Sequence, residues 1–164
     1  MRLDEIDCQI LDALQREGRI RNKDMADRIG LSQSACLDRT RRLERIGVII
    51  GYKAMLNHAA LGAPLEVWGE VTLTENSPAA LARFSDLLHR TPAVVSAYRV
   101  AGRQDFLLHA HVSSIAIWDG VVQSANDAGL DIVRATTAVV VERVKDGPLK
   151  LSPTPSLRLI ENTA

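Results

Sequence analysis

The stretch Gly30-Leu31-Ser32-Gln33-Ser34-Ala35-Cys36-Leu37 decides the fold of the first third of this chain. Residues 22–29 before it carry apolar side chains at helical spacing, and residues 33–46 after it contain neither glycine nor proline. Asn22 is a plausible N-cap for the helix over residues 22–29, Gly30 is a suitable stop for it, and Ser32 is a suitable N-cap for the next helix. With a further helix predicted over residues 4–17, two helices that meet across so short a turn indicate a helix-turn-helix.

The helix predicted over residues 33–46 has two different faces. At 100° per residue, the face expected to pack against the domain carries Cys36, Thr40, Leu43 and Gly47. The opposite face carries Ser34, Asp38, Arg41, Arg42 and Arg45. For a lone helix, a solvated charged surface would explain these side chains. The preceding helix and the tight turn favour a helix that reads DNA instead.

Positive charge gathers around this helix, although the whole chain has a formal net charge of zero. Residues 48–54 are predicted to form a short pair of strands, the wing of a winged helix-turn-helix, with Lys53 against the phosphate backbone. Side chains and free N–H groups at the N-terminus of the helix suit phosphates and base edges. The predicted DNA-binding residues are Ser32, Gln33, Ser34, Asp38, Arg41, Arg42, Arg45 and Lys53.

From residue 63 the apolar pattern changes from helical to alternating. Strands are predicted over residues 65–73, 94–100, 106–112 and 131–144, and helices over 78–90 and 114–126. The order βαββαβ indicates a ferredoxin-like domain with both helices on one face of an antiparallel sheet. The other face would carry Trp68, Tyr98, Leu107 and Val140, which are too apolar to leave in water. We therefore expect two copies to pair through their sheets.

The predicted fold class is α+β, with a winged helix-turn-helix followed by a ferredoxin-like domain. The predicted divisions are residues 1–56 for DNA binding, 57–63 as linker, 64–146 for effector binding and oligomerisation, and 147–164 as an extended or disordered tail. The chain lacks an apolar run long enough to span a bilayer and a signal-peptide pattern, which predicts a cytoplasmic protein with no membrane partner. Cys8 and Cys36 show no disulfide or zinc-binding spacing.

Several segments resemble the Lrp/AsnC, or feast/famine, family of transcriptional regulators, and the resemblance extends to about Lys145. They are the opening residues 3–11, the segments 30–37 and 41–49, and Tyr98-Arg99-Val100-Ala101-Gly102 with Asp105-Phe106-Leu107-Leu108. The resemblance implies a nucleoid-associated regulator that binds double-stranded DNA. It also implies a homodimer, with assembly to an octamer left open. Asp38 departs from the basic residue usual in relatives, and either pairs with Arg41 or Arg42 or accepts a hydrogen bond from cytosine.

The family also binds a small effector, commonly an amino acid, at the loop after residue 99. Gly102 would let backbone N–H groups approach a carboxylate, and Asp105 would accept hydrogen bonds from an ammonium group, although either residue could serve the turn alone. Arg103 and Gln104 replace an acidic and an aromatic residue common in relatives, which favours an effector with a polar or acidic side chain. The site is predicted to be shared with an adjacent subunit, and its predicted effector-binding residues are Val100, Ala101, Gly102, Arg103, Gln104 and Asp105 of the loop and Thr136, Thr137 and Ala138 of the final strand.

An enzyme is the alternative, because decarboxylases of modified tetrapyrroles share this pair of domains and use histidine and arginine in their pockets. His109 and His111 alternate on one predicted strand, but no third ligand stands at recognisable spacing. We therefore expect packing or interface roles for both histidines, and no metal or cofactor. The basic helix over residues 33–46 favours a regulator without enzymatic activity.

Overall fold

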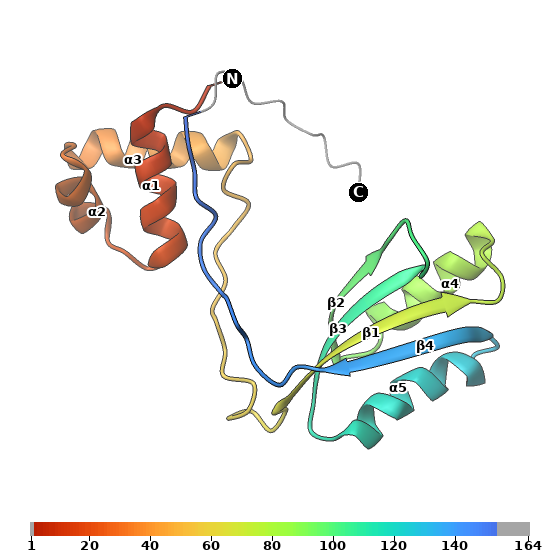
Figure 1. Cartoon of the computed structure of the whole chain (residues 1–164). Helices are drawn as coiled ribbons and strands as arrows, with labels where there is room; N and C mark the ends of the chain where they lie inside the picture. The colour runs from red at the N-terminus through yellow and green to blue at the C-terminus, as the bar shows by residue number, and fades with distance from the viewer. Residues whose placement is uncertain (1, 154–164) are drawn as a thin grey trace. The chain divides into compact units, whose positions relative to one another are not determined.

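The computed structural model describes residues 2–153, which fall into two compact units (Figure 1). The first unit comprises residues 2–55 together with residues 145–153, and the second comprises Leu56–Val144. The predicted boundary at residue 56 lies one residue from the structural one. Residues 57–63, predicted as a linker, belong to the second unit.

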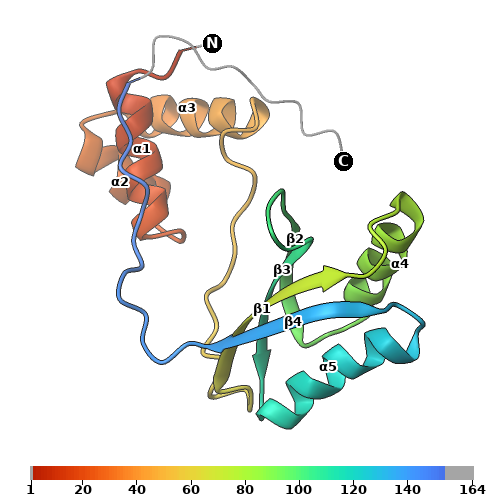
Figure 2. The ribbon, with the colours of Figure 1, turned by 45° about the vertical axis from the view of Figure 1, so that its right-hand side comes forward.

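Three helices form the first unit: α1 (Glu5–Arg16), α2 (Asn22–Ile29) and α3 (Gln33–Arg45). Figure 2 shows α3 crossing α1. A capping box starts α1, in which the Asp4 side chain accepts from the Asp7 N–H and the Asp7 side chain accepts from the Asp4 N–H. The buried apolar core of this unit consists of Leu3, Cys8, Ile10, Leu11, Ala13, Met25, Ala26, Cys36 and Leu43.

The turn between α2 and α3 has the predicted form, with one difference. Gly30 ends α2 at φ 77°, in the left-handed region, and the Ser32 Oγ accepts from the Ala35 N–H at 3.2 Å. The N-cap of α2 is Arg21 and not the predicted Asn22. Asn22 instead donates its side-chain amide to the Gln33 carbonyl at 2.8 Å, which links the start of α2 to the first turn of α3.

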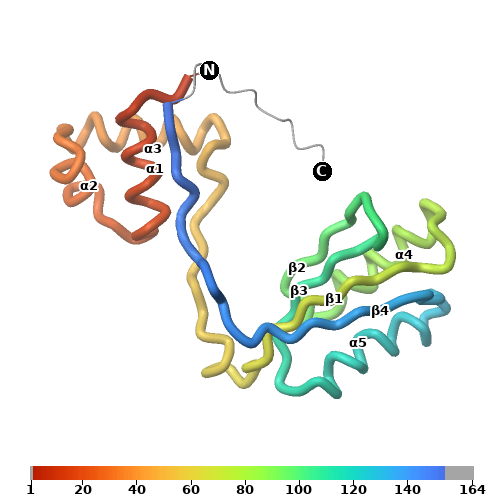
Figure 3. The backbone as a smooth tube through the Cα atoms, in the orientation of Figure 1, coloured from red at the N-terminus to blue at the C-terminus, as the bar shows by residue number. Residues whose placement is uncertain are grey.

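The predicted strand pair of the wing was wrong, because residues 46–64 contain no strand. The N–H groups of Val48 and Ile49 donate to the Leu43 carbonyl at 3.0 and 3.2 Å, and both side chains pack against the core of the first unit. These apolar residues therefore close the end of α3 rather than forming a sheet edge. Beyond them the chain runs on without secondary structure, with Ile50 94% exposed (Figure 3).

Residues 145–153, predicted in part as a free tail, belong to the first unit. Gln15 on α1 donates to the Leu149 carbonyl at 3.2 Å, and its side-chain oxygen accepts from the Leu149 N–H at 2.9 Å. Leu151 packs against the apolar core. The predicted tail continues into residues 154–164, which lie outside the described part of the chain.

The second unit confirms the predicted βαββαβ order. Its elements are β1 (Leu65–Leu73), α4 (Pro78–His89), β2 (Val94–Arg99), β3 (Phe106–Val112), α5 (Ile115–Asp127) and β4 (Ile132–Val139). The antiparallel sheet has the order β2-β3-β1-β4, and both helices lie on one face (Figures 1 and 2). The buried core lies between this face and the helices, with Val67 and Val71 of β1 packed among Phe84, Leu108 and Trp118.

The last strand is shorter than predicted and ends at Val139 rather than at residue 144. Its partner β1 sets this limit, since the register runs from Leu73 opposite Ile132 to Val67 opposite Val139. One further bond follows, from the Val140 N–H to the Glu66 carbonyl at 2.9 Å. With no further partner strand to pair with, residues 141–144 leave the sheet.

Candidate functional site

The exposed face of α3 carries most of the side chains that the helical spacing predicted. Cys36, Thr40 and Leu43 are buried on the opposite face, and the Thr40 hydroxyl donates to the Cys36 carbonyl at 3.0 Å. The exposed side chains are Gln33, Ser34, Leu37, Asp38, Arg41, Glu44 and Arg45. Leu37 is 37% exposed on this face and is not among the predicted DNA-binding residues, because an apolar side chain on a helix more often indicates a packed face. The other predicted DNA-binding residues, Ser32 and Lys53, are also exposed.

The placement of Arg42 on the free face was wrong. Its guanidinium forms an ion pair with Asp7, whose side chain is fully buried, and Arg39 bonds the same carboxylate at 3.0 Å. The capping box holds Asp7 at the start of α1 and in the interior, where an anion needs cationic partners. Arg39 also bonds Asp4 at 2.7 Å, and this bond holds the pKa of the Asp4 carboxyl below its ordinary value. Arg39 and Arg42 therefore join α3 to α1.

Asp38 is exposed and forms no ion pair within residues 2–153. The predicted pairing with Arg41 or Arg42 was therefore wrong. Arg42 is occupied by Asp7, and Arg41 also has no ion pair in the described part of the chain. The two exposed charges one turn apart on α3 are both available to a partner molecule.

Asp105, which was predicted to bind the effector, holds the loop between β2 and β3 to the sheet. The Asp105 carboxylate accepts from the Leu73 N–H at 2.9 Å and from the Asn76 amide at 2.8 Å. Its own N–H donates to the Val71 carbonyl at 2.9 Å. Both carboxylate oxygens thus have partners within the chain, so Asp105 positions the loop. Gly102 has no positive φ, so the turn does not require a glycine for its backbone conformation.

The two predicted parts of the effector site do not meet within one chain. Strand β1 lies between β3 and β4, which puts about 10 Å of sheet, two strand spacings, between the Asp105 loop and Thr136. Thr137 faces the helices, where its hydroxyl accepts from the Trp118 indole N–H at 2.8 Å. Thr136 and Ala138 pair with Glu70 and Trp68, which places them on the face without helices.

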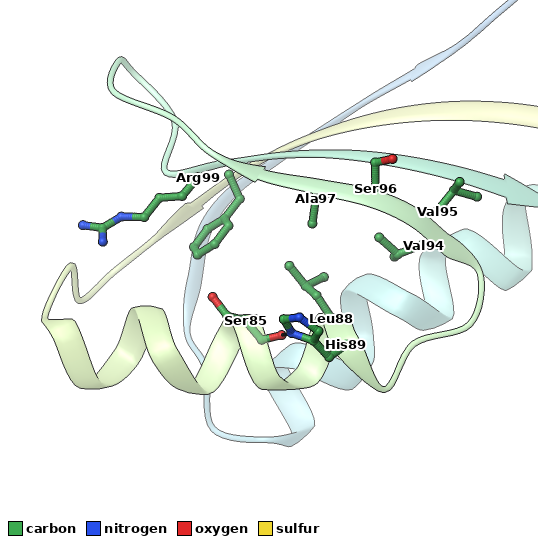
Figure 4. Close-up of a pocket in the computed structure, with 9 residues that line it drawn as sticks. Ser85, Leu88, His89, Val94, Val95, Ser96, Ala97 and Arg99 are labelled. Carbon is green, nitrogen blue, oxygen red and sulfur yellow. Dashed lines mark hydrogen bonds between the residues drawn. The ribbon is translucent and has the colours of Figure 1, made fainter. Parts of the chain in front are cut away.

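A cavity of about 360 Å³ adjoins the predicted effector loop, between α4 and the edge strand β2. Figure 4 shows Leu88 and His89 of α4 facing this strand, with Arg99 extending away from them beside the start of the loop. The His89 Nδ1 is hydrogen-bonded to the Ser85 carbonyl at 2.8 Å. The cavity shares no residue with the predicted effector site, which begins at Val100.

The helix-free face of the sheet holds a polar cluster between the strands β1 and β3. The His109 Nε2 lies 3.0 Å from Glu66 Oε1, and Arg143 bonds the other oxygen of Glu66 at 3.0 Å. His58 stacks on His111 with ring centroids 3.8 Å apart. Sequence reasoning missed Glu66 as a partner of the histidines, although the alternating pattern of residues 65–73 placed it on the outer face.

Burial and neighbouring charges shift two pKa values in this cluster. Desolvation, followed by the charges of His58 and His109, lowers the pKa of His111. Desolvation raises the pKa of Glu66, but hydrogen bonds from Arg143 and His109 outweigh it and leave the pKa below its ordinary value. The cluster therefore combines a carboxylate with an imidazole that favours its neutral form.

Comparison with known proteins assigns both units. Residues 3–50 match the model for winged helix-turn-helix DNA-binding domains, and residues 66–149 match the Lrp/AsnC ligand binding domain. The leucine-responsive regulatory protein of Rhizobium meliloti (strain 1021) is 39% identical over 144 residues, which cover 88% of this chain and 92% of that protein. The transcriptional regulatory protein DoeX of Halomonas elongata is 37% identical over 145 residues, covering 88% and 92%.

Solved structures agree with this assignment. The transcriptional regulator NMB0573 of Neisseria meningitidis, in complex with L-Met, superposes with a TM-score of 0.81 at 27% identity, covering 88% of this chain and 94% of that one. An AsnC family regulator of Agrobacterium tumefaciens gives a TM-score of 0.79 at 30% identity, with the same coverage.

A helix-turn-helix unit followed by a ligand-binding ferredoxin-like unit defines a class of DNA-binding transcriptional regulators that respond to a small molecule. The chain belongs to the Lrp/AsnC family of this class. The predicted fold class and the predicted function as a regulator are thereby confirmed. Within residues 2–153, the helices are all too short or too polar to cross a membrane.

Proposed function

We propose that this regulator reads double-stranded DNA with the exposed face of α3 and responds to an amino acid. The observation that carries the DNA-reading part is the capped, uninterrupted helix whose exposed face holds Asp38, Arg41 and Arg45 without ion pairs in the described part of the chain. Arginine suits guanine and phosphate, and an apolar side chain such as Leu37 suits the thymine methyl group. The start of α3 would contact the phosphate backbone of the DNA through Ser32, Gln33 and Ser34. The segment after α3 would contact the same backbone through Lys53.

Removal of an α3 arginine tests the DNA-reading face. Arg41→Ala or Arg45→Ala should weaken binding by about 1–3 kcal/mol and relax the preference at one base pair if the residue reads a base. Arg16→Ala removes the same charge from α1 and is the matched control. Binding to randomised operators, measured over a series of salt concentrations, provides both readouts. Equal losses in all three variants would contradict the proposed face.

A variant of Asp38 distinguishes base recognition from attraction to phosphate, because a carboxylate is not attracted to the negatively charged phosphate backbone of DNA. We infer that Asp38 accepts a hydrogen bond from a cytosine amino group. Asp38→Ala should then broaden the preference at a single base pair, whereas an unchanged operator profile would exclude a reading role.

We propose that the effector is an amino acid bound by the loop 100–105 together with Thr136 or Ala138 of an adjacent subunit, because Thr137 faces the helices and its hydroxyl is bonded to Trp118. The ligand-binding domain match and the L-Met complex of the Neisseria regulator support this class of effector. Because the two stretches lie about 10 Å apart within one chain, the site would need a second copy. The Asp105 oxygens already hold the loop, so the exposed Arg103 is the better candidate to choose among effectors.

A calorimetric screen of the twenty amino acids tests this proposal. Arg103→Ala should weaken the binding of a polar or acidic amino acid, and Arg90→Ala, which removes an exposed arginine from the end of α4, should not. Absence of binding at millimolar concentration would exclude an amino-acid effector.

We propose that the chain acts as a homodimer in the cytoplasm, bound to the nucleoid, and as a regulator rather than an enzyme. Its relatives are named regulators, and the helix-free face exposes apolar side chains such as Tyr98. Two-fold symmetry predicts half-sites spaced by about 10 bp or a multiple of it. If each dimer neutralises about six phosphates, the affinity should fall with salt at a log-log slope of about −5. A slope near zero would contradict this mode of binding, whereas a tetrapyrrole absorption band in the purified protein would favour the enzyme.

A further inference from the structure

Three side chains with metal-binding atoms converge on the helix-free face of the second unit. Glu66 pairs directly with His111 across the strands β1 and β3, and His109 is two residues farther along β3 on the same face. One ligand atom from each of Glu66, His109 and His111 lies within 4.8 Å of the other two. The strand pairing therefore supplies the third ligand that the spacing of the two histidines alone did not reveal.

The hydrogen bonds of the cluster leave one of its atoms unexplained. The Nδ1 of His111 is buried and has no hydrogen-bond partner among the described residues. Burying a polar atom without a partner is unfavourable, and most such atoms in proteins are satisfied. His58 covers the face of the His111 ring but stacks on it at an interplanar angle of 11°, so this contact gives the Nδ1 no partner. A simple packing role does not account for this arrangement.

We propose that Glu66, His109 and His111 form a binding site for a divalent transition metal ion, with Zn²⁺ as the ion that fits best. Ligand atoms about 2.0–2.2 Å from a tetrahedral zinc ion lie roughly 3.3–3.6 Å from one another. The separation of 3.0 Å between Glu66 Oε1 and His109 Nε2 is already close to that geometry. Small side-chain rotations would bring in His111.

The ligand set selects the class of ion. Two imidazoles and one carboxylate suit Zn²⁺ and its neighbours in the first transition series, whereas Mg²⁺ and Ca²⁺ prefer oxygen ligands alone. The ion would take the place of the hydrogen-bonding proton between Glu66 and His109: a neutral His109 would bind it through Nε2 and carry its proton on Nδ1, and a protonated His109 would release one proton to solvent. Arg143 donates to the second oxygen of Glu66 at 3.0 Å and can orient the carboxylate toward the ion. Three protein ligands leave a fourth position for water.

Metal titration of the full chain tests this proposal. After removal of bound metal with a chelator, the native protein should bind one Zn²⁺ per chain in calorimetry. With Co²⁺ it should show the visible bands of a tetrahedral nitrogen and oxygen site. Glu66→Gln and His111→Gln should each weaken Zn²⁺ binding by at least about tenfold, as loss of a ligand costs no less than loss of an outer partner.

His89→Gln is the matched control, because His89 lies on α4 and bonds the Ser85 carbonyl. It should bind Zn²⁺ as the native chain does. Circular dichroism establishes that each variant is folded, and the Co²⁺ spectrum distinguishes the site from binding elsewhere. The proposal is overturned if the native chain binds neither ion, or if both variants of the cluster retain native affinity. An equal loss in His89→Gln would also overturn it. The amino-acid screen is independent, so either proposal can fail alone.

Discussion

Asp7 shows how one buried carboxylate organises the first unit at the scale of a residue. Its side chain is fully buried, accepts the Asp4 N–H in the capping box, and receives both Arg39 and Arg42 from α3. Removing one member of a buried ion pair leaves the others without compensation, which is costlier than the pair's net contribution. The side chains of Arg39 and Arg42 are 34% and 36% exposed, so water screens part of that cost.

We therefore expect Asp7→Asn to lower the free energy of unfolding of the first unit by about 2–4 kcal/mol, toward the lower part of the range for buried pairs because the arginines are partly solvated. Denaturant unfolding followed by helical circular dichroism measures this loss. Asp12→Asn breaks an exposed pair with Arg16 on the same helix and should have a much smaller effect. Comparable losses in the two variants would show that the burial of Asp7 is not what matters.

Gly69 illustrates a residue whose missing side chain is required. A Cβ at this position of β1 would lie 2.5 Å from the ring of Trp118, which is buried beneath the sheet. Gly69→Ala should destabilise the second unit by about 1–3 kcal/mol, the usual cost of overpacking a core. It should also alter the fluorescence of Trp118. Gly120→Ala is the control, since its Cβ would meet no atom within 4 Å on α5 and alanine favours a helix.

At the scale of elements, capping residues and apolar periodicity were sufficient to predict a helix or strand whose bounds depend on its own residues. Ser32 and Gly47 predicted the start of α3 correctly and its end to within one residue. The alternation of apolar and polar side chains predicted β1 over residues 65–73. The predictions were wrong where the conformation of a segment depends on contacts with a residue outside that segment. The apolar run after Gly47 could be a strand or a packed segment, and only its bonds to Leu43 settle which.

The candidate sites follow the same rule. The spacing of α3 predicted its exposed face but not the loss of Arg42 from it, because Asp7 stands 35 residues earlier in the chain. Similarly, the two histidines of β3 were visible in the sequence, whereas Glu66 is 43 residues from His109 and reaches it only through the register of β1 and β3. An ion pair or a set of ligands that joins two elements can be identified only when the structure shows which residues of those elements lie opposite each other.

The segment 145–153 behaves as an element of the first unit through its contacts with α1. Gln15→Ala removes both hydrogen bonds to Leu149 at once. The segment should then open more often, so that trypsin cleaves after Lys150 faster while the helices stay folded. Gln9→Ala removes an exposed glutamine from the same helix without touching these bonds and should leave the cleavage rate unchanged. Unaltered cleavage in Gln15→Ala would mean that apolar packing of Leu151 holds the segment alone.

At the scale of the whole molecule, the helix-free face of the sheet is where assembly, effector binding and metal binding would meet. Trp68, Leu107 and Tyr98 lie on this face, and Tyr98 is 53% exposed in a single chain.

A lysine placed on this face would be buried between two copies and would leave an uncompensated charge there. We therefore expect Leu107→Lys to convert the proposed dimer to monomers in sedimentation equilibrium and to reduce affinity for a palindromic operator, because a monomer engages only one half-site. Ile117→Lys introduces the same charge at an apolar residue of α5 that is 52% exposed, and should change neither property. Dissociation by Ile117→Lys with a stable Leu107→Lys dimer would place the interface on the helices instead.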